Sequence, residues 1–223
     1  MILLEKTEVL GWEAAIRGMR NPLNSWDKSD STVVLHAAVC VGDNDLDLMT
    51  RLRNAGTDHR KFMRMLTVYV DITAPLYWFK EFDTYKVGTV ANSCSTMHKI
   101  HAKEFTLDDF SLDRTFETEN GWIDAADGTK YLSPFTFFEG IVHQLNVYRE
   151  KFLSTKDKTW WWQMIQLLPT SYNQKRTVML NYEVLANMYR SRKAHKLDEW
   201  VDFCKWIETL PYKELICGVA KDS

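Results

Sequence analysis

The stretch DTYKVGTVANSCSTMHK, from Asp83 to Lys99, carries a dense set of groups that could bind a polar ligand. It contains hydroxyls, amides, cations and a thiol, but one Gly and no Pro, and it directly follows the apolar and aromatic stretch APLYWFKEF. Polar residues in such a run either form a solvated loop or line a site that holds a polar ligand. Taken alone, the stretch leaves both interpretations open.

A second candidate consists of Asn181, Asn187 and Arg192. Asn181 and Arg192 are eleven residues apart, about three turns at about 3.6 residues per turn, so on a helix they share one stripe with Asn187 on an adjacent flank. An arginine beside core-facing positions can anchor a carboxylate or phosphate, or lie over a ring. The spacing alone also fits a solvated helix face.

Two further clusters allow a binding interpretation and a structural one. The stretch DHRKFMR, from Asp58 to Arg64, has three cations and a His just before an expected strand, which indicates either anion binding or a solvated helix end. The three tryptophans at Trp160–Trp162 could stack on a base or a flavin ring. Large aromatic side chains dominate cores and interfaces, which favours packing or an oligomer interface.

Common catalytic and phosphate-binding motifs are absent, among them GxGxxG, the Walker loop, GxSxG and HExxH. His98 and His101 are three residues apart and could share a helix face, but a lone pair is weak evidence for a metal. The four cysteines are widely spaced, with no zinc-ligand pattern. We therefore predict no metal site.

Composition indicates a globular protein in a reducing compartment. The 223 residues are 45% hydrophobic and 26% charged, with a net charge of -2 and a pI of about 6.3, so no overall basic field suits nucleic acid or an acidic membrane. The first twenty residues are too charged for a signal peptide, and no run of eighteen apolar residues exists. We expect a soluble, cytoplasmic protein with reduced thiols.

Hydrophobic spacing and capping residues predict a mainly helical α+β domain with a small central sheet. The stretch RMLTVYVDITAP, which ends at Pro75, is expected to be a strand, and residues 32–41 could be a strand or a buried helix. The acidic, irregular residues 104–132 are expected to run over the surface. The expected helices are one ending near Asn21, one over 43–56 capped by Asp43 or Asn44, one over 76–85, one beginning within 91–100, one or two over 133–169 with Ser133 as cap, and a long one over 181–211.

The C-terminal part carries a specific spacing. Pro169 follows Leu168 and precedes Asn181 by twelve residues, with Asn187 six residues later and Arg192 eleven after Asn181. In this spacing the sequence resembles the flavin-dependent thymidylate synthases, also called ThyX.

The stretch after the expected strand resembles the signature R-H-R-x-x-S-x-N-x-x-S-x-R of the same family. The matching places hold Lys86, Thr89, Asn92 and Ser95, with one extra residue between Thr89 and Asn92, and they follow Ala74-Pro75 and Trp78-Phe79. The stretch AGTDHRKFMRMLTVYV is similar to the family's Gly-His-x-x-x-Phe entry to that strand. The three segments span about residues 10–210, so the resemblance implies a single ThyX-like domain over residues 1–223.

The sequence departs from the family at charged positions. The arginines and histidine of R-H-R are missing, with Tyr85 and Lys86 nearby, and the closing Arg of the signature is Met97. The Arg that often stands two residues after the first C-terminal Asn is Glu183. Contacts that arginine makes in the family are then expected from other cations, namely Lys86, His98, Lys99 or Arg60.

The resemblance implies a methyltransferase of nucleotide biosynthesis that converts dUMP to dTMP. It implies a homotetramer with FAD at subunit junctions, methylenetetrahydrofolate as the one-carbon donor and NADPH as the reductant. No protein nucleophile need attack the base, because the cofactor supplies the hard chemistry and the protein supplies orientation and electrostatics.

Carried over position by position, the resemblance assigns catalysis to Arg192 and Ser95, with Arg192 gripping the pyrimidine edge and stabilising charge on the uracil. The implied substrate-binding residues are Ser93, Cys94, Ser95, Thr96, Met97, His98, Lys99, Gln166 and Arg192. The implied FAD-binding residues are His59, Arg60, Lys61, Lys86, Asn181, Glu183 and Asn187.

Two other functions remain open. A related pyrimidine-nucleotide hydroxymethylase or methylase would keep the fold and the nucleotide site, and altered flavin contacts favour it. A catalytically inactive ThyX-fold binding protein would keep the fold alone, because a fold does not fix a function.

Overall fold

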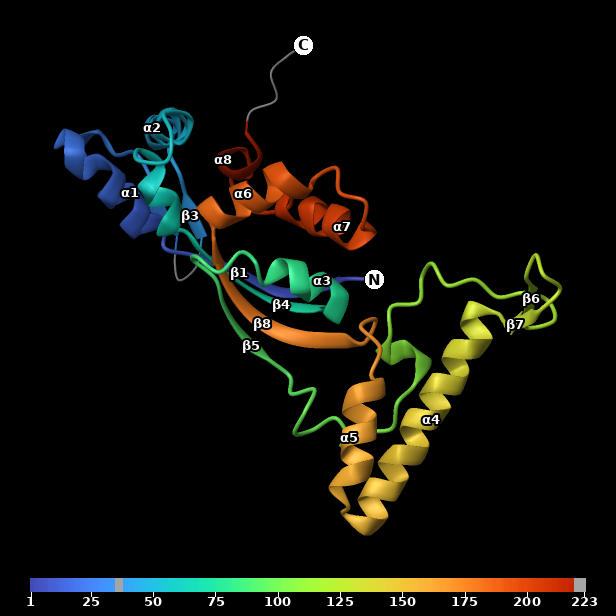
Figure 1. Cartoon of the computed structure of the whole chain (residues 1–223). Coiled ribbons are helices and arrows are strands. Elements are labelled where there is room, and N and C mark those ends of the chain that lie inside the picture. Colours follow the sequence, from blue (N-terminus) through green and yellow to red (C-terminus); the bar gives the residue numbers. More distant parts are fainter. Residues whose placement is uncertain (35–37, 219–223) are drawn as a thin grey trace. The chain divides into compact units, whose positions relative to one another are not determined.

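The computed structural model describes residues 1–34 and 38–218, which form two compact units (Figure 1). Unit 1 comprises Met1 and residues 73–80 and 93–175. Unit 2 comprises the described residues of 2–72, 81–92 and 176–218. The single domain expected from the sequence remains a prediction.

A four-stranded sheet in the order β1-β4-β8-β5 has most of its residues in unit 2. Its strands are β1 (Leu3–Leu10), β4 (Thr67–Pro75), β8 (Asn173–Asn181) and β5 (Val90–Ser93). In β4 every second side chain is buried, including Val68, Val70 and Ile72, as the two-residue period of a strand requires. The expected strand ending at Pro75 is confirmed.

The stretch 32–41 forms strands in its described part. β2 (Thr32–Val34) pairs antiparallel with β3 (Ala38–Cys40). Residues 35–37, with His36, lie outside the described residues. The strand alternative is therefore the correct one where the structure describes this stretch.

The helices of unit 2 begin with α1 (Trp12–Arg20) and α2 (Asp43–Asn54) and continue after β8 with α6 (Tyr182–Arg192), α7 (Asp198–Ile207) and α8 (Glu214–Cys217). Short 3-10 helices, η1 (Asn21–Leu23), η2 (Trp26–Lys28) and η3 (Arg60–Arg64), connect the N-terminal elements. The helix α3 (Leu76–Phe82) follows Pro75 and confirms the helix expected there.

The long helix expected over 181–211 is wrong, because the chain makes two helices there. Asn181 is the last residue of β8 and the N-cap of α6, where its side chain accepts a hydrogen bond from the Val184 N–H at 3.0 Å. It therefore shares no helix stripe with Arg192. Between the two helices the ring nitrogen Nδ1 of His195 accepts from the Leu197 N–H at 3.2 Å.

The cap of α2 also differs from expectation. The N-cap is Gly42, and the carboxylate of Asp30 accepts from the N–H groups of Asn44 and Asp45 at 2.9 and 3.1 Å. Neither Asp43 nor Asn44 is the cap, because the acceptor comes from a residue thirteen positions before the first helical residue. The first N–H groups of a helix need hydrogen-bond acceptors, but sequence spacing reveals only acceptors that are close in the chain.

Unit 1 contains the helical hairpin of α4 (Pro134–Thr155) and α5 (Lys158–Leu167). Ser133 caps α4 by accepting from the Thr136 N–H at 3.2 Å, and Pro134 stands at its first position, so the predicted start is confirmed. A small core fills the unit with Ile100, Phe105, Phe110, Val142, Leu145 and Met164.

The stretch 104–132 is largely irregular, as expected. It contains η4 (Leu107–Asp109) and β6 (Trp122–Asp124), which pairs antiparallel with β7 (Lys130–Leu132). Phe105 and Phe110 anchor its first part in the core of unit 1.

Among the residues that the structure describes, no helix has the length and apolar character needed to span a membrane. The α+β fold class, mainly helical with a small sheet, is confirmed.

Candidate functional site

The predicted substrate segment, residues 93–99, lies in unit 1 and is not helical. The helix expected to begin within 91–100 is wrong, because the chain leaves β5 at Ser93 and enters a series of turns. Ser95 organises the turn through its hydroxyl oxygen, which accepts from the N–H groups of His98 at 2.8 Å and Met97 at 3.3 Å. A serine hydroxyl used in this way competes with regular helix.

Backbone contacts fix this segment within unit 1. The Cys94 N–H donates to the Lys175 carbonyl at 2.9 Å, and the Gln174 amide donates to the Cys94 carbonyl at 2.7 Å. The indole N–H of Trp161 on α5 donates to the Met97 carbonyl at 2.9 Å. The side chains are left for solvent or a ligand. Those of Ser93, Cys94, Ser95, Met97, His98 and Lys99 are exposed, and that of Thr96 is half-buried.

The three tryptophans of α5 separate into different roles. Trp160 stacks on Tyr148 with ring centroids 5.9 Å apart, and Trp161 holds the turn just described. Trp162 is 47% exposed, and Gln166, another predicted substrate residue, is also exposed on α5. Packing therefore accounts for the first two rings.

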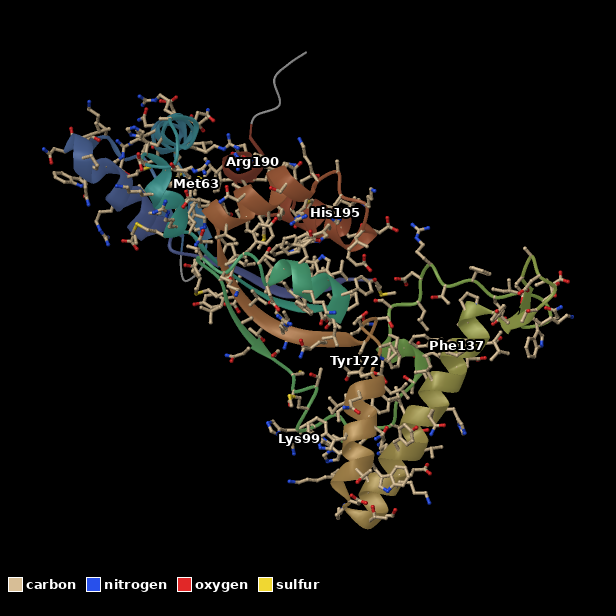
Figure 2. The ribbon with its side chains drawn as sticks, viewed as in Figure 1. Met63, Lys99, Phe137, Tyr172, Arg190 and His195 are labelled. Carbon is tan, nitrogen blue, oxygen red and sulfur yellow. The ribbon has the colours of Figure 1, made fainter. Side chains whose placement is uncertain are left out.

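Cations gather next to the substrate segment in unit 1. Burial lowers the pKa of His101, and the positive charges of Lys99, Lys156 and Arg149 lower it further. The Arg149 guanidinium donates to the His101 carbonyl at 3.0 Å. Lys99 is labelled in Figure 2 on the irregular chain after β5. Positive charge beside exposed hydroxyls suits a phosphate group.

In unit 2, Arg192 is held by a carboxylate and two aromatic rings. It forms an ion pair with Glu81, and its Nε donates to the Tyr85 hydroxyl at 2.8 Å. Its guanidinium carbon lies 5.1 Å from the ring centroid of Trp200 and 5.6 Å from that of Tyr85, within the range of cation–π attraction. Arg192 is thus fixed in orientation before any ligand arrives.

Glu81 connects Arg192 to α7. Its second oxygen accepts from the Trp200 indole N–H at 2.7 Å, and the Nε2 of His195 lies 3.6 Å from the same oxygen. His195 is labelled in Figure 2 between α6 and α7. Three residues of this cluster were not predicted from the sequence, namely Glu81, His195 and Trp200.

Glu183 is committed to two arginines of unit 2. Its carboxylate accepts from Arg60 at 3.1 Å and forms a second ion pair with Arg64. Burial opposes ionisation of this side chain, but the hydrogen bonds from Arg64 and Arg60 outweigh it, so the pKa of Glu183 is lowered. The structure therefore brings the predicted residues Arg60 and Glu183 together.

A pocket of about 320 Å³ lies beside this pair in unit 2. Its lining includes Arg60 and Asn187, two predicted cofactor residues. It also includes Arg53, Arg190 and Lys193, which the sequence interpretation missed. Arg190 stands three residues after Asn187, and Lys193 stands three residues after Arg190, so the rule that positions three apart are neighbours on a helix could have revealed them.

The other predicted cofactor residues do not line this pocket. His59, Lys61 and Lys86 are exposed. Asn181 caps α6, and its amide also donates to the Gly88 carbonyl at 3.4 Å. Arg192 and all seven cofactor residues belong to unit 2, whereas residues 93–99 and Gln166 belong to unit 1.

Comparisons with known proteins identify the fold. No family model and no curated protein matches this sequence. Two crystal structures of thymidylate synthase X (ThyX) from Helicobacter pylori, both with FAD and dUMP, match at 16% identity with TM-scores of 0.64 and 0.65. The first match covers 96% of this chain and 94% of that chain, and the second covers 99% of both.

A structure of the UMP/dUMP methylase PolB from Streptomyces cacaoi, bound with 5-Br dUMP, matches with a TM-score of 0.56 at 14% identity. That match covers 94% of this chain and 88% of the other. At these identities the likeness shows the fold, and this chain has the fold of the ThyX proteins.

Proposed function

We propose that this chain, with its ThyX fold, binds dUMP and FAD and converts dUMP to dTMP. In the reaction a carbon passes from methylenetetrahydrofolate to C5 of the uracil, the C5 hydrogen leaves as a proton, and two electrons from NADPH reduce the transferred carbon to a methyl group. The fold likeness to structures that contain FAD and dUMP supports the choice of ligands.

The observation that carries the proposal is the fixed guanidinium of Arg192. The resemblance assigns this position to the pyrimidine edge, and the structure holds the side chain between Tyr85 and Trp200 with Glu81 as counter-charge. A preoriented cation can stabilise negative charge that develops on the base without reorganising during the reaction. A solvated helix face does not require an arginine to be held by contacts such as those with Glu81, Tyr85 and Trp200.

The residues of unit 2 fit an anionic flavin dinucleotide. Cations and an amide line the pocket beside Glu183, and these groups suit a diphosphate and polar ring edges. When bound, the flavin would supply hydride transfer. Arg60 and Asn187 would hold it from this pocket, while the roles of His59, Lys61, Lys86 and Asn181 come from the resemblance.

The turn at Ser95 would bind the nucleotide phosphate. Its exposed hydroxyls stand next to Lys99 and the other cations around His101. A phosphate there would gain charge-assisted hydrogen bonds. In this proposal Ser95 acts mainly by keeping the turn in its binding shape, since its oxygen already accepts two backbone N–H groups.

Three measurements test the function. Purified protein should show flavin absorbance at about 450 nm, a property of the cofactor. It should oxidise NADPH when dUMP is added, and it should release tritium from C5-labelled dUMP when folate and NADPH are present. Protein that neither binds FAD nor oxidises NADPH with dUMP would remove the proposal.

A related reaction is the second candidate. The fold likeness to a UMP/dUMP methylase favours a methylase or hydroxymethylase of another pyrimidine nucleotide. Product analysis by mass spectrometry, with UMP and dUMP offered separately, distinguishes the two. The homotetramer belongs to the same proposal, and light scattering on the purified protein tests it.

A further inference from the structure

Glu81 is a carboxylate of unit 2 to which the sequence interpretation gave no role. It lies in the last turn of α3, and the residues that follow it pack on α7. The ring of Phe82 lies edge-on to that of Phe203 with centroids 6.3 Å apart, and the ring of Tyr85 lies edge-on to that of Trp200 at 6.1 Å. These aromatic contacts fix the backbone of Glu81 beside α7.

The carboxylate oxygens of Glu81 have different surroundings. Oε2 accepts from the Trp200 indole N–H at 2.7 Å and lies 3.6 Å from Nε2 of His195, which Figure 2 labels. Oε1 pairs with Arg192 and has no other partner within residues 1–34 and 38–218. The side chain is 29% exposed, and a carboxylate oxygen can accept about two hydrogen bonds. One acceptor position on Oε1 is therefore open to a ligand.

Arg192 keeps hydrogen-bond donors beside this open acceptor. Its Nε donates to the Tyr85 hydroxyl, and its Nη1 pairs with Oε1 of Glu81. A guanidinium carries further N–H groups on its other terminal nitrogen. Those of Nη2 have no partner in the part of the chain that the structure describes. An open donor and an open acceptor therefore lie next to each other, and the ion pair holds them in place.

The edge of a pyrimidine carries groups that fit such a pair. Uracil has the acceptor O4 beside the donor N3–H, whereas cytosine has an amino group beside the acceptor N3. In the proposed function Arg192 stabilises negative charge that develops during attack by C5, and this charge reaches O4 because O4 is conjugated with C5. With Arg192 at O4, Oε1 of Glu81 faces N3. A carboxylate accepts hydrogen bonds and cannot donate them, so it attracts the N3–H of uracil and repels N3 of cytosine.

We propose that Glu81 determines which base the site accepts, because its Oε1 accepts the N3–H of a uracil nucleotide and excludes a cytosine nucleotide. This assignment rests on the proposed function, which brings the pyrimidine edge to Arg192. Glu81 then has two roles, since it orients Arg192 and also recognises the base. If Glu81 were only the counter-charge of Arg192, the preference for one base would not depend on residue 81.

Calorimetric titration of the full chain with dUMP and with dCMP, without folate or NADPH, tests this choice independently of turnover. The wild type should bind dUMP about tenfold to a hundredfold more tightly than dCMP, as expected for one hydrogen bond to a charged group. In Glu81→Gln the amide can turn its N–H groups toward N3 of cytosine, so this preference should fall by about tenfold. An equal preference in wild type and Glu81→Gln, or tighter binding of dCMP by the wild type, would overturn the proposal.

A change in the nucleotide tests the same hydrogen bond in the unaltered protein. dUMP methylated at N3 keeps both carbonyl oxygens but lacks the N3–H, so the wild type should bind it at least about tenfold more weakly than dUMP. Glu81→Ala lacks the acceptor and leaves room for the methyl group, so it should bind the two nucleotides with affinities within about threefold of each other. Equal affinities in the wild type, or an equally large loss in Glu81→Ala, would contradict the assignment.

The matched control is Glu208→Gln. It removes the same charge from a carboxylate that also accepts from an aromatic side chain, the Tyr189 hydroxyl at 2.6 Å, and it should leave the preference for dUMP unchanged. Selective binding of dUMP without dUMP-dependent oxidation of NADPH would remove the proposed reaction and support the role of Glu81. Turnover of dUMP with a base preference that Glu81→Gln does not alter would do the reverse, and absence of dUMP binding would remove both.

Discussion

Replacement of Glu183 by Gln tests whether the carboxylate is needed to hold Arg60 and Arg64 in unit 2. The side chain of Arg60 is 17% exposed and that of Glu183 is 10% exposed, so their hydrogen bond is largely shielded from water. A hydrogen bond to a charged group contributes about 1.5–3 kcal/mol. Arg64 is 53% exposed, and its ion pair adds only about 0–1 kcal/mol.

Glu183→Gln should therefore lower the free energy of unfolding by about 2 kcal/mol at pH 7, since Gln keeps one neutral acceptor. With a slope of about 2 kcal/mol per molar urea, the unfolding midpoint should fall by about 1 M. The matched control is Asp47→Asn. It makes the same change in an ion pair with Arg51 whose side chains are 67% and 66% exposed, and it should shift the midpoint little.

The pH dependence of this effect has a definite sign. The pKa of Glu183 is lowered in the folded protein from its ordinary value of 4.5, so the folded state favours the charged form. The resulting stabilisation is complete above about pH 4.5 and is lost as the pH falls through the folded value. The difference between wild type and Glu183→Gln should thus narrow in acid. A difference as small as that of the control, or one unchanged in acid, would refute the reasoning.

Three further predictions concern both units. Arg192→Ala should reduce dUMP-dependent turnover by about a hundredfold or more without changing the oligomer measured by light scattering, and unchanged turnover would exclude Arg192 from the site. Ser95→Ala should raise the KM for dUMP more than it lowers kcat, because the His98 N–H loses its acceptor, and an unchanged KM in steady-state kinetics would contradict this role. Asp45→Asn should lower the free energy of unfolding by about 3–5 kcal/mol in urea titration, because the Arg20 partner is only 4% exposed, and a loss below about 1 kcal/mol would be inconsistent with the buried pair.

Local sequence signals predicted the elements that depend on local physics. The strand ending at Pro75 follows from β-branched alternation, and the start of α4 follows from Ser133 and Pro134. The ThyX-like fold was expected from the resemblance to that family, which rests on the spacing of Asn181, Asn187 and Arg192 together with two further segments. The spacing of Asn181, Asn187 and Arg192 matches the family although the side chains at several signature positions differ.

Contacts between distant residues could not be predicted in this way. Asp30 caps α2, and Glu81 pairs with Arg192, 111 positions away. The helix expected to begin within residues 91–100 is absent because the hydroxyl of Ser95 closes a turn there. Residue propensity does not show this turn, nor the distant contact from the Trp161 indole that also holds it.

The structure also changes how the missing arginines are interpreted. At position 183 the sequence has a carboxylate where the resemblance leads one to expect a cation. The carboxylate instead draws Arg60 and Arg64 to itself, and Arg60 lines the pocket. Glu183, Arg60 and Arg64 together carry one net positive charge. The same pocket gains Arg190 and Lys193 from the next turns of α6. In unit 2, cations from α2, η3 and the C-terminal end of α6 line this pocket, so substitution at the signature positions alone does not argue against an anionic ligand.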